Sequence, residues 1–232
     1  MSINIEIDYP RSAVENMRLD EAAFLARENG ALTDTYLRLY SWRQPAISFG
    51  YAQTPEKLLA PGSAREQGVE IVRRITGGGL VLHQPNELTY CLVVPLPILP
   101  EGIIPSCNLI SSIFISALRR IKVRARIAGK IEMLVTDYSR DFCFVRPTKY
   151  EVMVGGQKLL GSAQKRGRFY LLQHGSLPLD PYLPVFAEFL DIRQIRRYST
   201  NIQKITGQEY RYQDIARIVA EEFRKSEVFK SC

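Results

Sequence analysis

The apolar residues between Leu109 and Ile121 recur with the spacing of one helix face, and no other segment constrains the fold as strongly. They fall at positions i, i+1, i+4, i+5, i+8, i+9 and i+12: Leu109, Ile110, Ile113, Phe114, Ala117, Leu118 and Ile121. Ser106 and Asn108 precede this stripe and are candidate N-caps, because their side chains can accept hydrogen bonds from free backbone N–H groups. The spacing therefore predicts an amphipathic helix that begins near residue 108.

Strand-like segments occupy the centre of the chain, and helical segments lie towards its ends. Apolar spacing predicts a helix over residues 17–26, with Asn16 as candidate N-cap, and short helices over residues 182–190 and 214–223. Strands are predicted over residues 36–42, 46–51, 70–74, 80–82, 88–94, 123–127, 150–154, 157–163 and 170–174, the first two as neighbours. Gly155-Gly156 predicts the turn of a β-hairpin. This order predicts an α+β fold, with central mixed or antiparallel β-sheets flanked by α-helices.

Hydropathy argues against a membrane protein. The longest apolar stretch, residues 91–100, is short and contains Pro95, Pro97 and Pro100, so it does not predict a spanning helix. The first twelve residues lack the apolar segment of a secretory signal. We therefore expect a cytoplasmic enzyme or binding protein, and the 232 residues, 46% of them hydrophobic, suffice for one globular domain with a buried core.

The charge balance favours an acidic partner. Lys and Arg number 31 against 24 Asp and Glu, which gives a net charge of +7. The positive residues are mostly scattered, and no recognisable nucleic-acid-binding module accompanies them. Direct binding of nucleic acid is therefore not expected.

The cysteine pattern does not predict a metal site. Cys91, Cys107, Cys143 and Cys232 include no CxxC pair, and the chain has only two histidines. In a cytosolic setting each cysteine is a free thiol, which acts either as a small buried hydrophobe or as a reactive thiolate.

A glycine run gives the first candidate site. Arg73 and Arg74 come shortly before Gly77-Gly78-Gly79, where the absence of Cβ atoms lets backbone N–H groups approach an anion or a carbonyl closely. The run lacks the Walker spacing, and a glycine bulge at a tight strand bend is the structural alternative. His83, four residues further on, favours a site, although a single histidine is also common in a satisfied core.

A second candidate site lies between residues 141 and 180. Lys158 opens an apolar strand, where an ammonium is costly to bury without an anionic or carbonyl partner, unless the side chain extends to solvent. Gly161 and Ser162 are small enough to let a ligand lie against this strand, and Gln164 and His174 can donate hydrogen bonds to it.

Cys143 is the candidate nucleophile of this second site. Its neighbours Phe142 and Phe144 are also typical of a cysteine buried by packing. Lys158 follows fifteen residues later across the predicted hairpin, and an ammonium beside a thiol favours the thiolate. A cysteine and a lysine that converge near a glycine-lined wall are a plausible acyl-transfer site.

Four segments together resemble one known family, the lipoate/biotin protein ligases and octanoyltransferases. They are NMRLDEAAF at residues 16–24, LRLYSWRQPAISFGYAQ at residues 37–53, RRITGGGLVLHQPNELTY at residues 73–90, and residues 143–180. Within that family the chain is most similar to the cysteine-dependent octanoyltransferases. The matching positions are Cys143-Phe144, Pro147, Tyr150-Glu151, Lys158, GSAQ at residues 161–164 and LQHGS at residues 172–176.

The resemblance implies a biotin/lipoate protein ligase-like catalytic domain over residues 1–185, with a helical C-terminal extension over residues 186–232 packed on it. It implies that Cys143 takes an octanoyl group from an acyl carrier protein as a thioester. The group then passes to a lysine of a lipoyl domain, in the glycine cleavage H protein or a 2-oxoacid dehydrogenase E2 subunit. Lys158 would depress the thiol pKa, the glycine run with Arg74 and His83 would line the acyl pocket, and no cofactor would be required.

Two other readings stay open. Gly79 stands where those transferases usually have Arg, and a triple glycine is more typical of ATP-dependent lipoate ligases, which would use ATP and Mg²⁺ with Cys143 as a spectator. A non-catalytic binder of lipoyl domains or acyl carriers is the third reading. The sequence does not decide between octanoyl and lipoyl, nor does it fix the oligomeric state.

Overall fold

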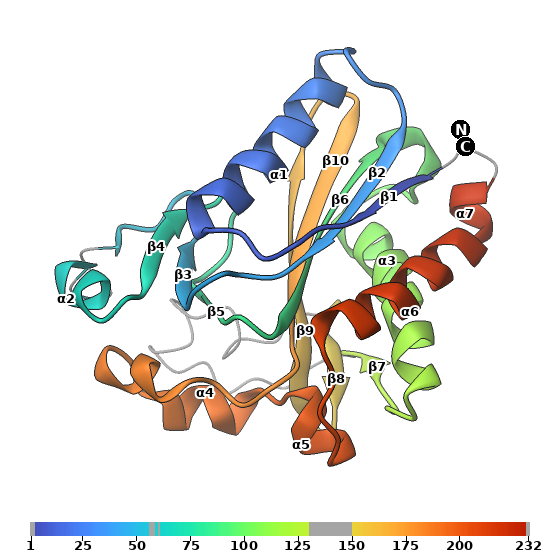
Figure 1. Cartoon of the computed structure of the whole chain (residues 1–232). Coiled ribbons are helices and arrows are strands. Elements are labelled where there is room, and N and C mark those ends of the chain that lie inside the picture. Colours follow the sequence, from blue (N-terminus) through green and yellow to red (C-terminus); the bar gives the residue numbers. More distant parts are fainter. Residues whose placement is uncertain (1–2, 56–58, 60, 130–149, 231–232) are drawn as a thin grey trace.

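The computed structural model describes residues 3–55, 59, 61–129 and 150–230, which form an α+β fold with one large and one small β-sheet (Figure 1). The strands are β1 (Ile3–Ile7), β2 (Thr35–Tyr40), β3 (Ala46–Phe49), β4 (Glu70–Arg73), β5 (Val81–His83), β6 (Glu87–Pro95), β7 (Arg126–Ile127), β8 (Val152–Val154), β9 (Gln157–Arg166) and β10 (Tyr170–Pro178). The helices are α1 (Ala13–Glu28), α2 (Pro61–Glu66), α3 (Ile103–Arg120), α4 (Ile192–Tyr198), α5 (Ile202–Thr206), α6 (Tyr212–Lys225) and α7 (Glu227–Lys230), with 3₁₀ turns at Leu96–Ile98 and Pro184–Glu188. The predicted fold class is confirmed.

The large sheet has seven strands in the order β1-β2-β6-β10-β9-β8-β7, and the small sheet has three in the order β4-β3-β5. In the large sheet β1 and β2 are parallel and the other pairs are antiparallel. The register places His174 on β10 opposite Cys91 on β6 and Ala163 on β9. The small sheet is mixed, because β3 runs parallel to β4 and antiparallel to β5.

The prediction that the strands near residues 36–42 and 46–51 are neighbours is wrong. β2 pairs with β1 and β6 in the large sheet, whereas β3 pairs with β4 and β5 in the small one. Between them Arg43 and Gln44 form a bend before Pro45, which has no backbone N–H to donate to a ladder. The connection therefore carries the chain from one sheet to the other.

Helix α1 covers one face of the large sheet and begins earlier than predicted. Ser12, not Asn16, is its N-cap, in a capping box where Ser12 Oγ accepts from the Glu15 backbone N–H and Glu15 accepts from the Ser12 N–H. Asn16 is instead buried inside the helix, where its amide donates to the Ser41 carbonyl at 3.1 Å. Asn16, a residue type common at N-caps, therefore makes a tertiary contact with Ser41 instead.

Helix α3 also begins before its predicted start. Gly102 is the N-cap, with φ at 91° and no side-chain cap, so Ser106 and Asn108 are not caps. Pro105 falls in the first turn, where its missing N–H costs nothing, and the helix therefore extends beyond the apolar stripe. The hydroxyl of Ser106 donates to the carbonyl of Gly102 at 2.7 Å.

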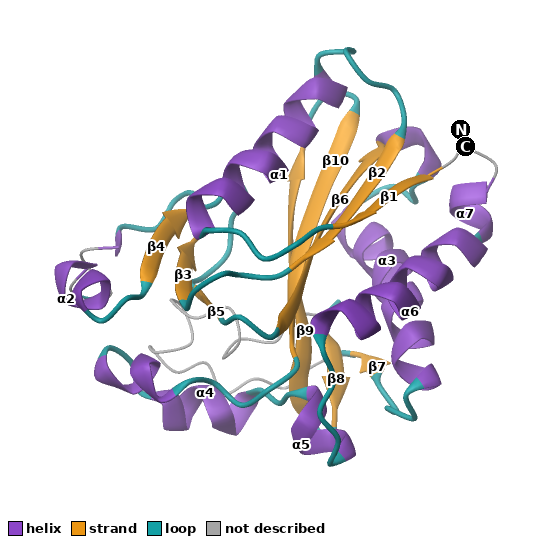
Figure 2. Cartoon of the chain, in the orientation of Figure 1, coloured by secondary structure: helices purple, strands orange, loops and turns teal. Residues whose placement is uncertain are grey.

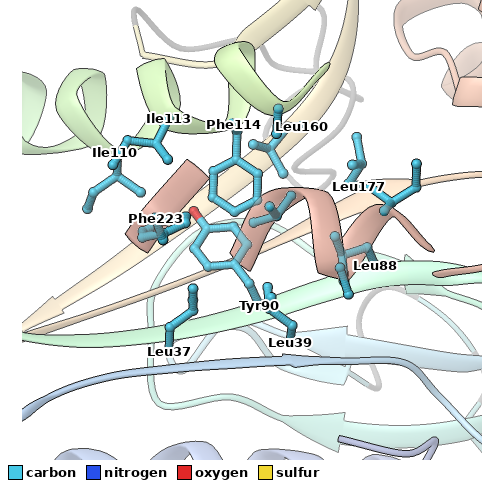
Figure 3. Packing of buried hydrophobic residues seen from close by; sticks show 14 of the residues in the cluster. Leu37, Leu39, Leu88, Tyr90, Ile110, Ile113, Phe114, Leu160, Leu177 and Phe223 are labelled. Carbon is cyan, nitrogen blue, oxygen red and sulfur yellow. The ribbon is translucent and has the colours of Figure 1, made fainter. Parts of the chain in front are cut away.

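The main hydrophobic core lies between the large sheet and the helices α3 and α6 (Figure 3). Tyr90 from β6 contacts Phe114 of α3 with ring centroids 4.5 Å apart, and Phe114 meets Phe223 of α6 at 5.6 Å. A second cluster on the other face packs α1 residues Met17 and Phe24 against the sheet. Helices thus lie on both faces of the large sheet (Figure 2), and the site lies on the α1 side.

The C-terminal half confirms some predicted elements and corrects others. Gly155 and Gly156 have φ values of 55° and 82°, in the left-handed region that the β8–β9 turn requires, so the predicted hairpin is confirmed. The predicted strand over residues 123–127 is only Arg126–Ile127 in the structure, and Val123 before it is buried in the main core. Residues 182–190 contain a 3₁₀ turn rather than an α-helix, and α4 and α5 were not predicted. None of the described helices combines the length and apolarity needed to cross a bilayer.

Candidate active site

A pocket with a cavity volume of about 30 Å³ opens where the two sheets meet α1. Its polar lining side chains come from β3, β5, β6, β9 and β10 and from the segment after β4: Ser48, Arg74, His83, Thr89, Ser162, His174 and Ser176. Its other lining residues are Met17, Tyr40, Trp42, Val81, Gly161, Ala163 and Gly175. A mainly apolar cavity with a few convergent polar groups is the usual form of a small-ligand site.

Arg74 organises the glycine run from inside the protein. Its Nη2 donates to the carbonyls of Gly77 at 2.9 Å and Gly79 at 2.7 Å, and its Nη1 donates to the Ser48 carbonyl at 2.9 Å. The side chain is buried and lines the pocket, but these glycines do not line it. The run is therefore a braced loop beside this pocket, and a role of the glycines in lining an acyl site stays a prediction.

Gly50 lets the glycine run approach β3. A Cβ at Gly50 would lie 2.0 Å from the carbonyl oxygen of Gly78, a separation that real Cβ atoms do not show. Gly78 itself has a φ of 93°, which favours glycine. Sequence reasoning identified the run but missed Gly50, because the need for that glycine arises from a contact between distant segments.

His83 lies at the centre of a buried polar cluster. Its Nδ1 is 2.7 Å from Glu87 Oε1, its Nε2 is 2.7 Å from Ser48 Oγ, and its ring stacks on Trp42 with centroids 3.9 Å apart. Trp42 Nε1 also donates to Glu87 Oε1 at 3.0 Å, as do the hydroxyls of Thr89 and Ser176 at 2.6 and 3.0 Å. Glu87 is thus a fully buried carboxylate that several donors satisfy.

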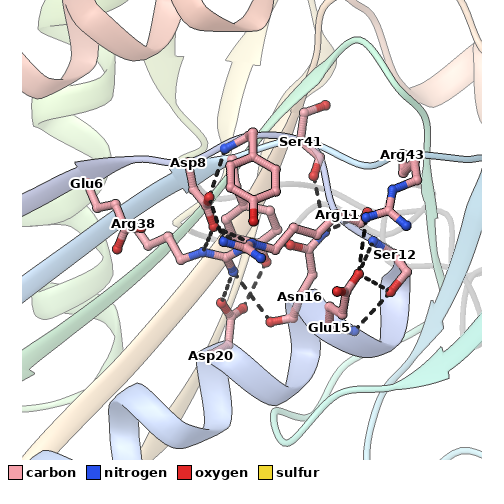
Figure 4. A network of polar contacts seen from close by, with 12 residues as sticks. Glu6, Asp8, Arg11, Ser12, Glu15, Asn16, Asp20, Arg38, Ser41 and Arg43 are labelled. Atoms are coloured by element: carbon pink, nitrogen blue, oxygen red, sulfur yellow. Dashed lines mark hydrogen bonds and ion pairs between the residues drawn. The ribbon is translucent and has the colours of Figure 1, made fainter.

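His174 forms a second cluster of the same kind. Its Nε2 is 2.6 Å from Thr76 Oγ1 and its Nδ1 is 3.2 Å from Asp20 Oδ2. Burial lowers the pKa of His174, and the hydrogen bond to Asp20 opposes this shift. Asp20 also pairs with Arg38, which in turn bridges to Asp8 (Figure 4). Burial thus favours the neutral form of His174, and the contacts with Thr76 and Asp20 orient its ring.

Lys158 is fully buried, so the alternative that it extends to solvent is wrong. Its Nζ lies 2.7 Å from Glu151 Oε1, and the exposed fractions of the two side chains are 0% and 2%. Lys158 does not appear among the described pocket-lining residues, although Gly161 on the same strand does. Cys143 lies outside the described residues, so its predicted approach to Lys158 stays a prediction.

Ser162 and Gln164 belong to a hydrogen-bonded row across β6, β9 and β10. Tyr90 OH is 2.8 Å from Ser162 Oγ and accepts from Gln173 Nε2 at 2.6 Å, while Gln164 Nε2 donates to Gln173 Oε1 at 2.7 Å. Gly161 and Ser162 line the pocket as predicted, whereas Gln164 does not and is bonded to protein groups.

The two described cysteines are buried thiols. Burial raises the pKa of Cys107 to about 12 and that of Cys91 well above its ordinary value. Both are free thiols whose raised pKa disfavours the reactive thiolate. Of the two roles considered for the cysteines, Cys91 and Cys107 therefore have that of small buried hydrophobic residues. Cys143 and Cys232 lie outside the described residues.

The pocket brings together five of the predicted site residues, Arg74, His83, Gly161, Ser162 and His174. Sequence reasoning missed Trp42, Ser48 and Glu87. Glu87 could have been identified from the sequence, because it is a charged residue at the start of a mainly apolar strand, four residues after His83. Nothing in the sequence distinguishes Ser48 and Trp42 as site residues, since both lie in segments with the ordinary pattern of strands.

One known family of catalytic domains matches most of this chain. The family described as lipoyl protein ligase A/B catalytic domain matches residues 12–224, and the chain belongs to that family. The predicted resemblance is therefore confirmed.

Curated relatives include octanoyltransferases named LipM. The protein from Moorella thermoacetica is 39% identical over 71% of this chain and 60% of its own length. The protein from Kyrpidia tusciae is 40% identical over 73% of this chain and 63% of its own. The chain thus spans about three fifths of the length of these relatives.

Solved structures support the fold. Lipoate-protein ligase A bound with ATP gives a TM-score of 0.80 at 18% identity, covering 100% of this chain and 92% of that one. A bipartite lipoate protein ligase from Thermoplasma acidophilum, studied with its E2 lipoyl domain, gives 0.77 at 17% identity, with coverages of 100% and 90%. At this identity the likeness establishes the architecture.

Proposed function

We propose that this chain is a cytoplasmic, cysteine-dependent octanoyltransferase of lipoate metabolism that requires no nucleotide. Cys143 takes an octanoyl group from an acyl carrier protein and passes it to a lysine of a lipoyl domain, in the glycine cleavage H protein or an E2 subunit. The octanoyltransferases that are 39% and 40% identical support this activity. The ligase studied with its E2 lipoyl domain supports that class of acceptor.

The observation that carries the proposal is the buried ammonium of Lys158. It lies on β9, three residues before the pocket-lining Gly161, and Glu151 compensates its charge at 2.7 Å. A cation held away from water interacts strongly with nearby charge, so it favours a thiolate on an approaching cysteine. It also stabilises the oxyanion that forms when a thioester carbonyl is attacked.

The transfer takes place in two steps, acylation of Cys143 and transfer of the acyl group to the acceptor lysine. The thiol of Cys143 loses its proton, and the thiolate attacks the carbonyl carbon of the donor thioester. The bond from that carbon to the carrier sulfur breaks, and the carrier sulfur leaves as a thiol by taking up one proton in place of the one that Cys143 lost. The amine of the acceptor lysine then attacks the new thioester. An amide forms, the amine loses a proton, and the thiol of Cys143 is released.

The other described thiols do not suit this role. The pKa values of Cys91 and Cys107 are raised by burial, so neither forms a thiolate readily at neutral pH. The assignment of Cys143 rests on its sequence context, with Phe144, Pro147 and Tyr150-Glu151 at the positions of the cysteine-dependent enzymes.

An ATP-dependent lipoate ligase is the second candidate, favoured by the triple glycine at Gly77–Gly79. Such an enzyme needs donors for phosphate beside the run. The three guanidinium nitrogens of Arg74 donate to Thr76, Ser48, Gly77 and Gly79, and Nη1 of Arg73 donates to the carbonyls of Tyr51 and Gln53. Because the guanidinium of Arg74 is engaged by the protein, it is not available to a phosphate, and the octanoyltransferase relatives lead us to prefer the transferase.

A transfer assay tests the proposal. With octanoyl carrier protein and an unmodified lipoyl domain, but without nucleotide, we expect the wild-type protein to acylate the acceptor and Cys143→Ala to be inactive. Activity only with free octanoate or lipoate plus ATP and Mg²⁺, unchanged in Cys143→Ala, would establish the ligase instead. Binding of the lipoyl domain without transfer under either condition would point to a non-catalytic binder.

A further inference from the structure

Two matched hydrogen-bonded relays converge on Arg74 at the wall of the pocket. One runs from Ser48 Oγ through His83 to Glu87, with contacts of 2.7 and 2.7 Å. The other runs from Thr76 Oγ1 through His174 to Asp20, with contacts of 2.6 and 3.2 Å. Each relay joins a hydroxyl to the Nε2 of a histidine and a carboxylate to its Nδ1.

Arg74 joins the hydroxyl ends of the two relays. Its Nη1 donates to Ser48 Oγ at 3.2 Å and its Nε donates to Thr76 Oγ1 at 3.2 Å. A guanidinium has no acceptor, so both hydroxyls accept from Arg74. Their own protons are then available for His83 and His174.

Four donor groups surround the carboxylate ends of the two relays, and three of them, the Trp42 indole, the Gln84 backbone N–H and the Arg38 guanidinium, cannot accept. The indole N–H of Trp42 donates to Glu87 Oε1 at 3.0 Å, and the backbone N–H of Gln84 donates to Oε2 at 3.2 Å. Arg38 Nη1 donates to Asp20 Oδ1 at 3.1 Å, and Tyr40 OH donates to Oδ2 at 2.8 Å. Both carboxylates therefore act as acceptors, and the histidine Nδ1 atoms must supply protons to them.

We propose that Glu87 and Asp20 are positioning residues of the acyl site, each of which fixes one histidine as its neutral Nδ1–H tautomer. The Nε2 atoms then accept from Ser48 and Thr76, and the oriented hydroxyls secure Arg74 and the glycine run that it braces. This arrangement of protons satisfies every one of these contacts across the pocket wall, and it is the one that we propose. Only the kinetic consequence of this arrangement rests on the proposed function.

If the proposed function holds, loss of these hydrogen bonds should weaken binding of the acyl group. Ser48, His83 and His174 line the pocket, and Lys158 is not among its described lining residues, so the relays shape the pocket wall rather than the reacting carbonyl. A loosened wall weakens substrate and transition state alike, which raises KM more than it lowers kcat.

The chain has only two histidines, and both lie in the relays, so nitrogen NMR of histidine-labelled protein reports on them directly. At neutral pH we expect both rings to carry a proton on Nδ1 and none on Nε2. Glu87→Gln should change only the His83 signals, and Asp20→Asn only those of His174. Asp34→Asn, which alters a distant ion pair with Arg27, is the control that should change neither. An Nε2–H tautomer or a charged ring in the wild-type protein would overturn the proposal without any variant having to fold.

A matched pair of variants tests the kinetic part. Thr76→Ser keeps the hydroxyl and should leave KM for the octanoyl donor near the wild-type value, whereas Thr76→Val removes it and should raise KM about tenfold, with kcat changed less than about threefold. Equal KM values for the two variants would contradict the positioning role. If wild-type protein transferred no acyl group, the proposed function would fail, while the NMR result would still decide the tautomers.

Discussion

At the scale of single residues, Lys158 and Glu151 form a buried ion pair near the site. Both side chains are buried, and their charged atoms lie 2.7 Å apart. Removing one partner of a buried pair leaves the other charge uncompensated, whereas removing both need not destabilise the fold. Single and double substitutions of this pair can therefore distinguish its effect on stability from its effect on activity.

Lys158→Met is predicted to lower the free energy of unfolding by about 3–5 kcal/mol and to abolish acyl transfer. Lys158→Met combined with Glu151→Gln should recover much of the stability, because no lone buried charge remains, but should stay inactive. Urea unfolding and the transfer assay measure the two effects. A stable, active Lys158→Met would show that the ammonium serves neither purpose.

His174 gives a prediction on pH. Burial lowers its pKa below the ordinary value of 6.5, so the unfolded chain binds a proton near that value while the folded chain stays neutral. The unfolded state thus holds more protons in this window, and the free energy of unfolding should fall as pH drops from about 6.5 towards the folded pKa. His174→Gln should flatten this slope in urea titrations. An unchanged slope in that variant would assign the titration to another group.

The site shows which residues a sequence can reveal. His83 and His174 were predictable because histidine is rare in this chain and each lies in a distinctive motif. Asp20 was not, since its role depends on His174, 154 positions away. The partner of Lys158 could be anticipated as an anion from the cost of burial, but its identity as Glu151 required the structure.

At the scale of elements, close approach between β3 and the glycine run makes Gly50 indispensable. Gly50→Ala would place a Cβ 2.0 Å from the Gly78 carbonyl oxygen, which is backbone and cannot move aside without shifting the run. We predict a loss of about 1–3 kcal/mol in stability and weaker acyl transfer. Gly77→Ala is the matched control for folding, because nothing lies within 4 Å of its added Cβ. Equal thermal midpoints for the two variants would contradict the packing argument.

Periodicity located most elements, while their ends depended on contacts. The apolar stripe over Leu109 to Ile121 identified α3, but the helix starts at Ile103 because its first turn tolerates Pro105. The runs that became β2 and β3 were recognised as strands, yet nothing local showed that they belong to different sheets. Strand partners are set by tertiary packing, which a single sequence does not display.

At the scale of the whole molecule, the large sheet separates the main hydrophobic core from the pocket with its polar side chains. Tyr90 and Leu92 on β6 face α3 and α6, while Thr89 and Cys91 on the same strand face the α1 side. The alternation of one strand thus supplies both the stabilising core and a wall of the pocket. The order of the predicted elements was enough to predict the fold class. Which β6 side chains face the core and which face the pocket became known only from the strand register in the structure.

The central claim is that acyl transfer passes through a covalent intermediate on Cys143. The most direct measurement is the intact mass of the purified protein after incubation with octanoyl carrier protein in the absence of nucleotide. We predict a gain of one octanoyl group, located on the peptide that contains Cys143, removed by hydroxylamine and absent from Cys143→Ala. An unchanged mass in the wild-type protein, or an equal gain in Cys143→Ala, would contradict the claim.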